Sequence, residues 1–199
     1  MKSHSLDVRV VALDFDGVLV DSVAAKNRAY VDAFERYPEV RRELLRLRLN
    51  EPHLNRVEFF DRAHETVWRG APGAPSRAEF LEAMSDAMVD RVSACPSMEG
   101  ADRLWRAWPN ATMAIVSLTP ESDLRRIVRR RGYPVAEHRV FGCPPWSKSR
   151  ALREILHVEA IPPGAMLVVG DSPSDAVVAG EVGATYRGVG TGSAPWFAV

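Results

Sequence analysis

Three short apolar runs, each followed at once by polar residues, constrain the fold of this 199-residue chain more than any other feature. The runs are Val8 to Phe15, Ala111 to Leu118 and Ala165 to Gly170. Uninterrupted, valine-rich runs of this length are typical of strands that are buried on both faces of a parallel sheet. Two further short strands are predicted at residues 140–141 and 184–189.

Helical patterns separate these strands. Pro120 is predicted to occupy the first turn of one helix, and Gly132 is predicted to end it. Residues 149–158 and 174–182 repeat the pattern, and Gly183 follows the second of them. Strands that alternate with helices predict right-handed crossovers and therefore an α/β fold, a doubly wound parallel sheet.

The stretch from residue 21 to residue 95 contains no strand-like run, and its apolar residues recur at helical spacing. After a turn-rich segment at residues 70–75, Ser76 and Glu79 match a capping box that opens a helix. This helical stretch is too long for a crossover, so we interpret residues 21–95 as an inserted α-helical cap domain. The core then comprises residues 1–20 and 96–199.

Composition excludes several classes of protein. The chain has 26 Lys and Arg against 26 Asp and Glu, so its net charge is zero and gives no global attraction to nucleic acid or an anionic membrane. No apolar run approaches the roughly 20 residues of a membrane span, and residues 1–7 lack the hydrophobic stretch of a signal peptide. Cys95 and Cys143 do not make a disulfide framework or a metal knuckle. We therefore expect a cytoplasmic globular protein that binds neither nucleic acid nor membrane.

Polar side chains stand at the carboxyl ends of the three best predicted strands, where open parallel sheets bind ligands. They are Asp14 with Asp16, Ser117, and Asp171 with Asp175. Asp14 and Asp16 are two residues apart, so on a strand they would point the same way and would need a cation to offset their repulsion. Asp171 and Asp175 are four residues apart, which predicts that they share one face of a helix that begins there.

Four carboxylates that converge at one edge describe an oxygen-ligand site suited to Mg²⁺. Ser117 offers a hydroxyl and Lys148 a compact positive charge, and both groups fit a phosphoryl oxygen. Such a site, with a carboxylate nucleophile, predicts phosphoryl transfer through an aspartyl phosphate. For Asp16 or Asp171 taken singly, capping of a helix is the alternative.

These residues resemble the motifs of the haloacid dehalogenase-like hydrolase superfamily, in particular its phosphatases with an α-helical cap after the first motif. Residues 14–18 resemble the first motif, Ser117 the second, Lys148 the third and residues 170–175 the fourth, and the likeness extends to the tail at residues 188–192. The resemblance implies a Rossmann-like core and places the chain near phosphoglycolate phosphatases and β-phosphoglucomutases.

The resemblance also implies a role for each residue. Asp14 would attack phosphorus, and Asp16 would protonate the leaving group and then activate water. The Mg²⁺ ligands would be Asp14, Asp171 and the backbone carbonyl of Asp16, with support from Asp175. Ser117 and Lys148 would bind the transferring phosphate, and Lys148 would also take part in catalysis.

Several positions depart from the family pattern. Leu118 stands where many members carry Asn, and Lys26 stands where mutases usually carry His, whereas Asp16 speaks against dehalogenases and phosphonoacetaldehyde hydrolases. The expected function is Mg²⁺-dependent hydrolysis of a small soluble phosphomonoester, with a β-phosphoglucomutase-like mutase and a catalytically silent binding protein as alternatives. Phosphoglycolate, a sugar phosphate and a nucleoside monophosphate all remain open as substrates, and the oligomeric state is undetermined. Candidate substrate contacts in the cap are Lys26, Arg48, His53, Arg56, His64 and Trp68.

Overall fold

The computed structural model describes residues 7–51, 54, 56–69 and 73–189. The chain divides into two compact units, one made of Met1–Val23 with Cys95–Val199 and the other of Ala24–Ala94. The predicted positions His53, 70–72 and 190–192 lie outside the described residues. Within the described ranges, no helix is both long and apolar enough to cross a membrane.

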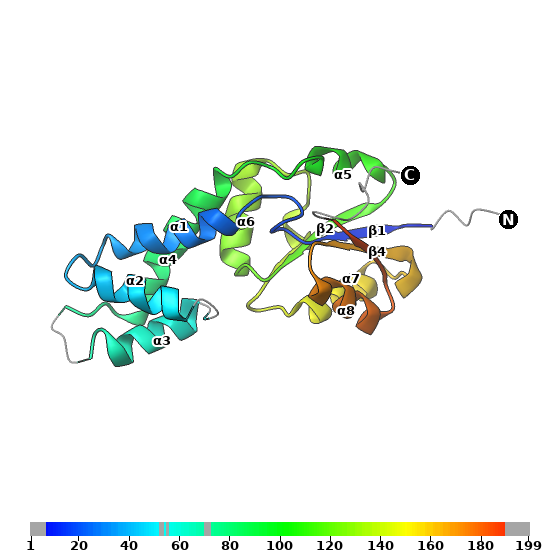
Figure 1. The fold of residues 1–199 in the computed structure, drawn as a ribbon. Helices are drawn as coiled ribbons and strands as arrows, with labels where there is room; N and C mark the ends of the chain where they lie inside the picture. The colour runs from blue at the N-terminus through cyan, green and yellow to red at the C-terminus, as the bar shows by residue number, and fades with distance from the viewer. Residues whose placement is uncertain (1–6, 52–53, 55, 70–72, 190–199) are drawn as a thin grey trace. The chain divides into compact units, whose positions relative to one another are not determined.

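The first unit is built on a five-stranded sheet in the order β3-β2-β1-β4-β5, and all neighbouring strands are parallel (Figure 1). The strands are β1 (Val10–Leu13), β2 (Thr112–Ser117), β3 (Val140–Gly142), β4 (Met166–Gly170) and β5 (Thr185–Gly188). Every residue of β1 and β4 is buried, which is why their sequences are apolar without alternation. The α/β fold with a parallel sheet is confirmed.

Helices cover both faces of this sheet (Figure 1). The helices are α5 (Ala101–Ala107), α6 (Glu121–Arg131), α7 (Lys148–Val158) and α8 (Pro173–Val182), and short 3-10 helices η1 (Glu137–Arg139) and η2 (Pro163–Ala165) precede β3 and β4. Residues of α7 and α8, among them Leu152 and Ala179, share one buried cluster with Ala12 of β1 and Val168 of β4. Because the apolar faces of these helices are buried against the central strands, the carboxyl ends of β1, β2 and β4 are held at one edge of the sheet.

The second unit consists of helices α1 (Val23–Phe34), α2 (Arg41–Asn50), α3 (Arg56–Thr66) and α4 (Arg77–Ser93), with no strand among its described residues. Its core is aromatic: Phe59 stacks on Phe34 at 5.4 Å and on Phe80 at 6.1 Å between ring centroids. The predicted helical insert between the first two strands is therefore confirmed. The predicted capping box is also confirmed, since Ser76 Oγ accepts from the Glu79 N–H and Glu79 Oε2 accepts from the Ser76 N–H.

Removal of this cap should destabilise α4 in a pH-dependent way. Ser76→Ala should cost about 1 kcal/mol at neutral pH, because the variant loses the side-chain acceptor of an orphan backbone N–H. The hydrogen bonds from Ser76 hold the pKa of Glu79 below its usual value of 4.5. The stability that they add to the fold is therefore fully present above pH 4.5 and is lost as the pH falls through the pKa of Glu79 in the folded protein. Thermal melts at neutral pH and near pH 3 should show the gap between wild type and variant shrinking in acid. A gap that stays constant would contradict the assignment.

Element boundaries differ from the sequence predictions in several places. The strand predicted at residues 8–15 covers Val10–Leu13 only, and Pro120 precedes α6 as its N-cap instead of lying in its first turn. Helices α7 and α8 each begin one residue earlier than predicted. Helix α5 was not predicted, because seven residues are too few to show a helical periodicity in the sequence. Burial of Ala101 and Leu104 stabilises this short helix.

Candidate active site

Asp14 lies directly beyond β1, and its backbone N–H donates to Val169 O of β4 at 2.8 Å. Its carboxylate is held at both oxygens: Oδ1 accepts from the Phe15 N–H at 2.7 Å and Oδ2 lies 2.8 Å from Lys148 Nζ. The residue is only 9% exposed. Burial outweighs the attraction of Lys148 and raises the pKa of Asp14 to about 6. Proximity to Lys148 is therefore what favours the charged form of this buried carboxylate.

Asp16 lies in a tight loop beyond β1, where it forms an isolated parallel bridge with Val20. Its carboxylate accepts hydrogen bonds from three hydroxyls: Ser22 at 2.5 Å, Thr119 at 3.3 Å and Ser117 at 3.4 Å. Ser22 and Thr119 are buried and were missed by the sequence analysis, because single hydroxyl residues form no recognisable pattern. These hydroxyls hold the Asp16 carboxylate in one orientation.

Asp171 and Asp175 flank the start of α8 rather than sharing one of its faces, so that prediction is wrong. Helix α8 begins at Pro173 with Ser172 as its N-cap, which leaves Asp171 ahead of the helix. The reason is local: proline suits the first helical position because its missing N–H needs no partner there. Asp175 Oδ2 accepts from the Ser172 N–H at 3.2 Å and from Ser172 Oγ at 2.6 Å, which completes a capping box.

Three carboxylates nevertheless come together at this edge of the sheet. Asp14, Asp171 and Asp175 each offer an oxygen, and these oxygens all lie within 4.8 Å of one another. The pKa of Asp171 is raised by burial and by the nearby charge of Asp175. Asp16 is not one of these three: β1 ends at Leu13, and the Asp16 carboxylate accepts hydrogen bonds from hydroxyls, while its charge still helps to raise the pKa of Asp171.

Lys148, the first residue of α7, bridges two members of this cluster. Its Nζ lies 2.8 Å from Asp14 Oδ2 and 2.6 Å from Asp175 Oδ1. Burial lowers the pKa of Lys148, but the two carboxylates outweigh burial and the net shift is upward. Three carboxylates and one ammonium leave two negative charges among oxygen donors, which is the donor chemistry that suits Mg²⁺.

Ser117 and Leu118 stand side by side at the end of β2 but differ in exposure. Ser117 is buried, and its Oγ accepts from the Thr119 N–H at 3.1 Å while donating to Asp16. Leu118 is 64% exposed, so it presents an apolar side chain at the position where many members of the family that the sequence resembles carry Asn. The structure thus brings Ser117 to Asp16, and Lys148 to Asp14 and Asp175.

Gly17 is required by the close approach of its backbone to Asp171. A Cβ built on Gly17 would lie 2.0 Å from Asp171 Oδ2, and the residue has φ +74°. Gly17→Ala should therefore displace the Asp171 carboxylate and weaken Mg²⁺ binding by about 10- to 100-fold, measured by calorimetric titration.

Gly132→Ala is the matched control for this variant. Gly132 has φ +64° but no atom within 4 Å of its virtual Cβ, so the change brings backbone strain without a collision. Equal Mg²⁺ affinity in the two variants would refute the role given to Gly17.

Of the residues considered in the second unit, Trp68 is buried against Tyr37, Phe60 and Phe80 and serves packing. Arg48 donates to Leu54 O at 3.0 Å. Its guanidinium also lies over the Tyr30 ring at 4.1 Å.

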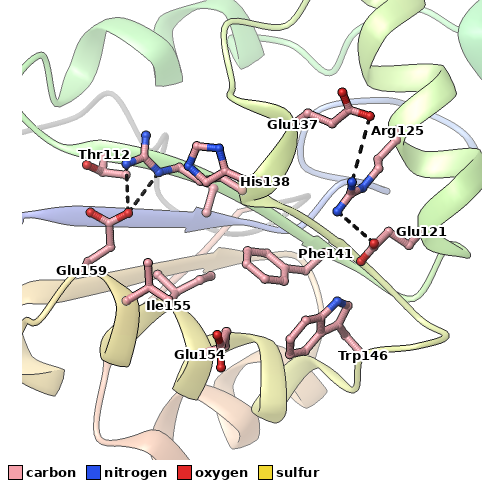
Figure 2. A pocket seen from close by; sticks show the side chains of 13 residues that line it. Thr112, Glu121, Arg125, Glu137, His138, Phe141, Trp146, Glu154, Ile155 and Glu159 are labelled. Atoms are coloured by element: carbon pink, nitrogen blue, oxygen red, sulfur yellow. Dashed lines mark hydrogen bonds and ion pairs between the residues drawn. The ribbon is translucent and has the colours of Figure 1, made fainter.

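A separate pocket of about 670 Å³ lies beside β3 (Figure 2). Its described lining includes none of the predicted catalytic, phosphate-binding and metal residues, which are Asp14, Asp16, Ser117, Lys148, Asp171 and Asp175. Its arginines face carboxylates: Arg125 lies 2.9 Å from Glu121, and Arg139 lies 3.0 Å from Glu159. Phe141 and Trp146 form much of its apolar floor (Figure 2). Four glutamates stand against these two arginines in the lining, so acidic side chains outnumber basic ones in this pocket as well.

Comparisons with known proteins agree on the fold. Residues 8–183 match the model of the haloacid dehalogenase-like hydrolases. No curated protein matches the chain in sequence.

Solved structures resemble the chain at low identity. A putative β-phosphoglucomutase from Thermotoga maritima is 16% identical over 95% of this chain and 89% of its own, with a TM-score of 0.66. CbbY from Rhodobacter sphaeroides, solved with phosphate, is 18% identical over 90% and 84%, with a TM-score of 0.65. A subfamily IA hydrolase of the same superfamily from Geobacter sulfurreducens is 19% identical over 94% and 89%, with a TM-score of 0.61. These likenesses show a shared fold, and the match over most of the sequence shows the family: the chain belongs to the haloacid dehalogenase-like hydrolases.

Proposed function

We propose that this protein is a Mg²⁺-dependent phosphatase that hydrolyses a small phosphomonoester through a phosphorylated Asp14. The observation that carries the proposal is the cluster of Asp14, Asp171 and Asp175 bridged by Lys148 at the carboxyl edge of the sheet. Structural neighbours support the substrate class: CbbY was solved with phosphate and, as a variant, with xylulose-1,5-bisphosphate. Residues 1–20 with 96–199 are proposed as the catalytic core, and residues 21–95 as the cap.

Mg²⁺ would be held by Asp14, Asp171 and the backbone carbonyl of Asp16, with Asp175 in support. When bound, the ion would offset the negative charge of the phosphoryl group. Ser117 and Lys148 would donate to phosphoryl oxygens, since a hydroxyl and an ammonium are both suitable donors.

The chain's own residues supply the nucleophile and the proton carrier for two displacements at phosphorus. A carboxylate oxygen of Asp14 forms a bond to phosphorus, the bond to the leaving oxygen breaks, and Asp16 gives its proton to that oxygen. Asp16 then takes a proton from water as the water oxygen bonds to phosphorus, and the bond to Asp14 breaks. Inorganic phosphate leaves, and both aspartates return to their starting protonation states.

Steady-state hydrolysis of p-nitrophenyl phosphate tests this proposal. We expect turnover with Mg²⁺, loss of turnover with EDTA, and recovery when Mg²⁺ is added in excess. Activity that persists unchanged in EDTA would exclude the metal requirement. With β-glucose 1-phosphate as substrate, phosphorus NMR separates the alternatives, because a phosphatase releases free phosphate whereas a mutase yields an isomeric sugar phosphate.

A further inference from the structure

The chain passes from the first unit to the second and back again. Within the first unit, the two segments next to these crossings are hydrogen-bonded to each other. Residues 19–21 form the outgoing segment and residues 95–98 the returning one. Val20 and Ser97 form an antiparallel bridge, and two backbone hydrogen bonds of 3.1 Å flank it. We call these two segments the crossing pair.

Arg131, the last residue of α6, attaches the crossing pair to the core. Its Nη1 donates to Cys95 O at 2.7 Å and its Nη2 donates to Ser97 Oγ at 2.9 Å. Its Nε donates to Tyr133 Oη at 2.9 Å, and that hydroxyl donates to Leu19 O at 3.4 Å. The side chain of one arginine therefore reaches both segments, one of them through Tyr133, because a planar guanidinium presents donors in several fixed directions.

The crossing pair is continuous with the loop that carries Asp16. Val20 bridges to Ser97 on one side and to Asp16 on the other. Ser22, just beyond the outgoing segment, donates to Asp16 Oδ1 at 2.5 Å. The Tyr133 ring meets Phe15, the residue between the two aspartates, edge-on at 6.3 Å between centroids. Any shift of the crossing pair therefore changes the surroundings of the Asp16 carboxylate.

We propose that Arg131 is a positioning residue for proton transfer by Asp16, through its hold on the crossing pair. The inference rests on the proposed phosphatase function. A residue that merely stabilised the fold would lower all activities together when replaced. Replacing a residue that positions Asp16 should instead slow most the substrates whose leaving group needs a proton. A small displacement of a proton donor slows a reaction only when that reaction uses the donor.

The test compares kcat/KM for two aryl phosphates in wild type, Arg131→Ala and Arg131→Lys. In Arg131→Ala, kcat/KM for phenyl phosphate should fall by about 10- to 100-fold, which is the range seen when an outer partner of a site residue is removed. The value for p-nitrophenyl phosphate should change much less, since its leaving group departs readily without a proton. Arg131→Lys should recover part of the loss, because an ammonium can still donate to one of the two segments.

Arg129→Ala is the matched control from the same turn of α6. Arg129 makes an exposed ion pair with Glu137 at 3.0 Å, so its removal should leave both kinetic values close to wild type. Equal losses for the two esters in Arg131→Ala, or no loss for either, would overturn the proposal.

Hydrogen exchange supplies a readout that does not depend on activity. The amides of Asp21 and Met98 are bonded across the crossing pair, and they should exchange at least about 10-fold faster in Arg131→Ala than in wild type or Arg129→Ala. If wild type hydrolyses neither ester, the proposed phosphatase function fails, while unchanged exchange at these amides shows that Arg131 does not hold the crossing pair.

Discussion

Asp14→Asn should abolish hydrolysis of p-nitrophenyl phosphate, with kcat lowered by about 10⁴-fold or more. An amide cannot form the bond to phosphorus, and the substitution also removes the charge that faces Lys148 Nζ at 2.8 Å. The side chain keeps its size, and its oxygen can still accept the Phe15 N–H. We therefore expect the loss to appear in turnover and not in the far-UV circular dichroism spectrum.

Asp102→Asn is the matched control for this variant. Asp102 is an exposed carboxylate in the first turn of α5, outside the cluster, and its replacement should leave kcat unchanged. Activity within about tenfold of wild type in Asp14→Asn would remove the nucleophile from the mechanism.

Asp16→Asn should lower turnover by about 10²- to 10⁴-fold, the usual contribution of a general acid and base. The two halves of the reaction should separate in this variant. With p-nitrophenyl phosphate the first displacement needs little proton donation, so p-nitrophenol should be released in a burst, whereas the hydrolysis of phosphorylated Asp14 should become slow. Rapid-quench kinetics should show a burst amplitude that approaches one product per enzyme, and the phosphorylated protein should be detectable by mass spectrometry.

The same experiment on Asp14→Asn provides the contrast, since no burst and no phosphorylated protein should form. If Asp16→Asn shows uniformly slow release of p-nitrophenol with no burst, Asp16 is not the base of the second displacement. Ser22→Ala, which removes the 2.5 Å hydrogen bond to Asp16, should show a smaller decrease in turnover than Asp16→Asn.

The strands could be predicted because a strand that is buried on both faces has an uninterrupted run of apolar residues in its sequence. The β1 and β4 runs are continuous and apolar, and their partners on either side are parallel strands from distant parts of the chain. The polar residues that end these runs fall at one edge whenever the sheet is parallel, so Asp14 and Asp171 could be paired from sequence alone. The second unit could be predicted as helical for a similar reason, since its apolar residues keep helical spacing.

Side-chain direction beyond a strand end could not be predicted in the same way. Residues two apart share a face only while the strand continues, and β1 stops at Leu13. The Asp16 carboxylate consequently accepts hydrogen bonds from Ser22, Ser117 and Thr119. The spacing of Asp171 and Asp175 was misleading for a related reason, because Ser172 and Pro173 open α8 between them.

The central place of β1 in the sheet affects how the chain is synthesised. Val10 of β1 pairs with Thr112 of β2 and with Met166 of β4, so β1 leaves the ribosome about a hundred residues before either of its sheet partners. At about 5–20 residues per second that interval lasts on the order of 5–20 s. During this time the apolar strand is exposed to aggregation and to chaperones, whereas the intervening helices make mainly local contacts and can fold as they emerge.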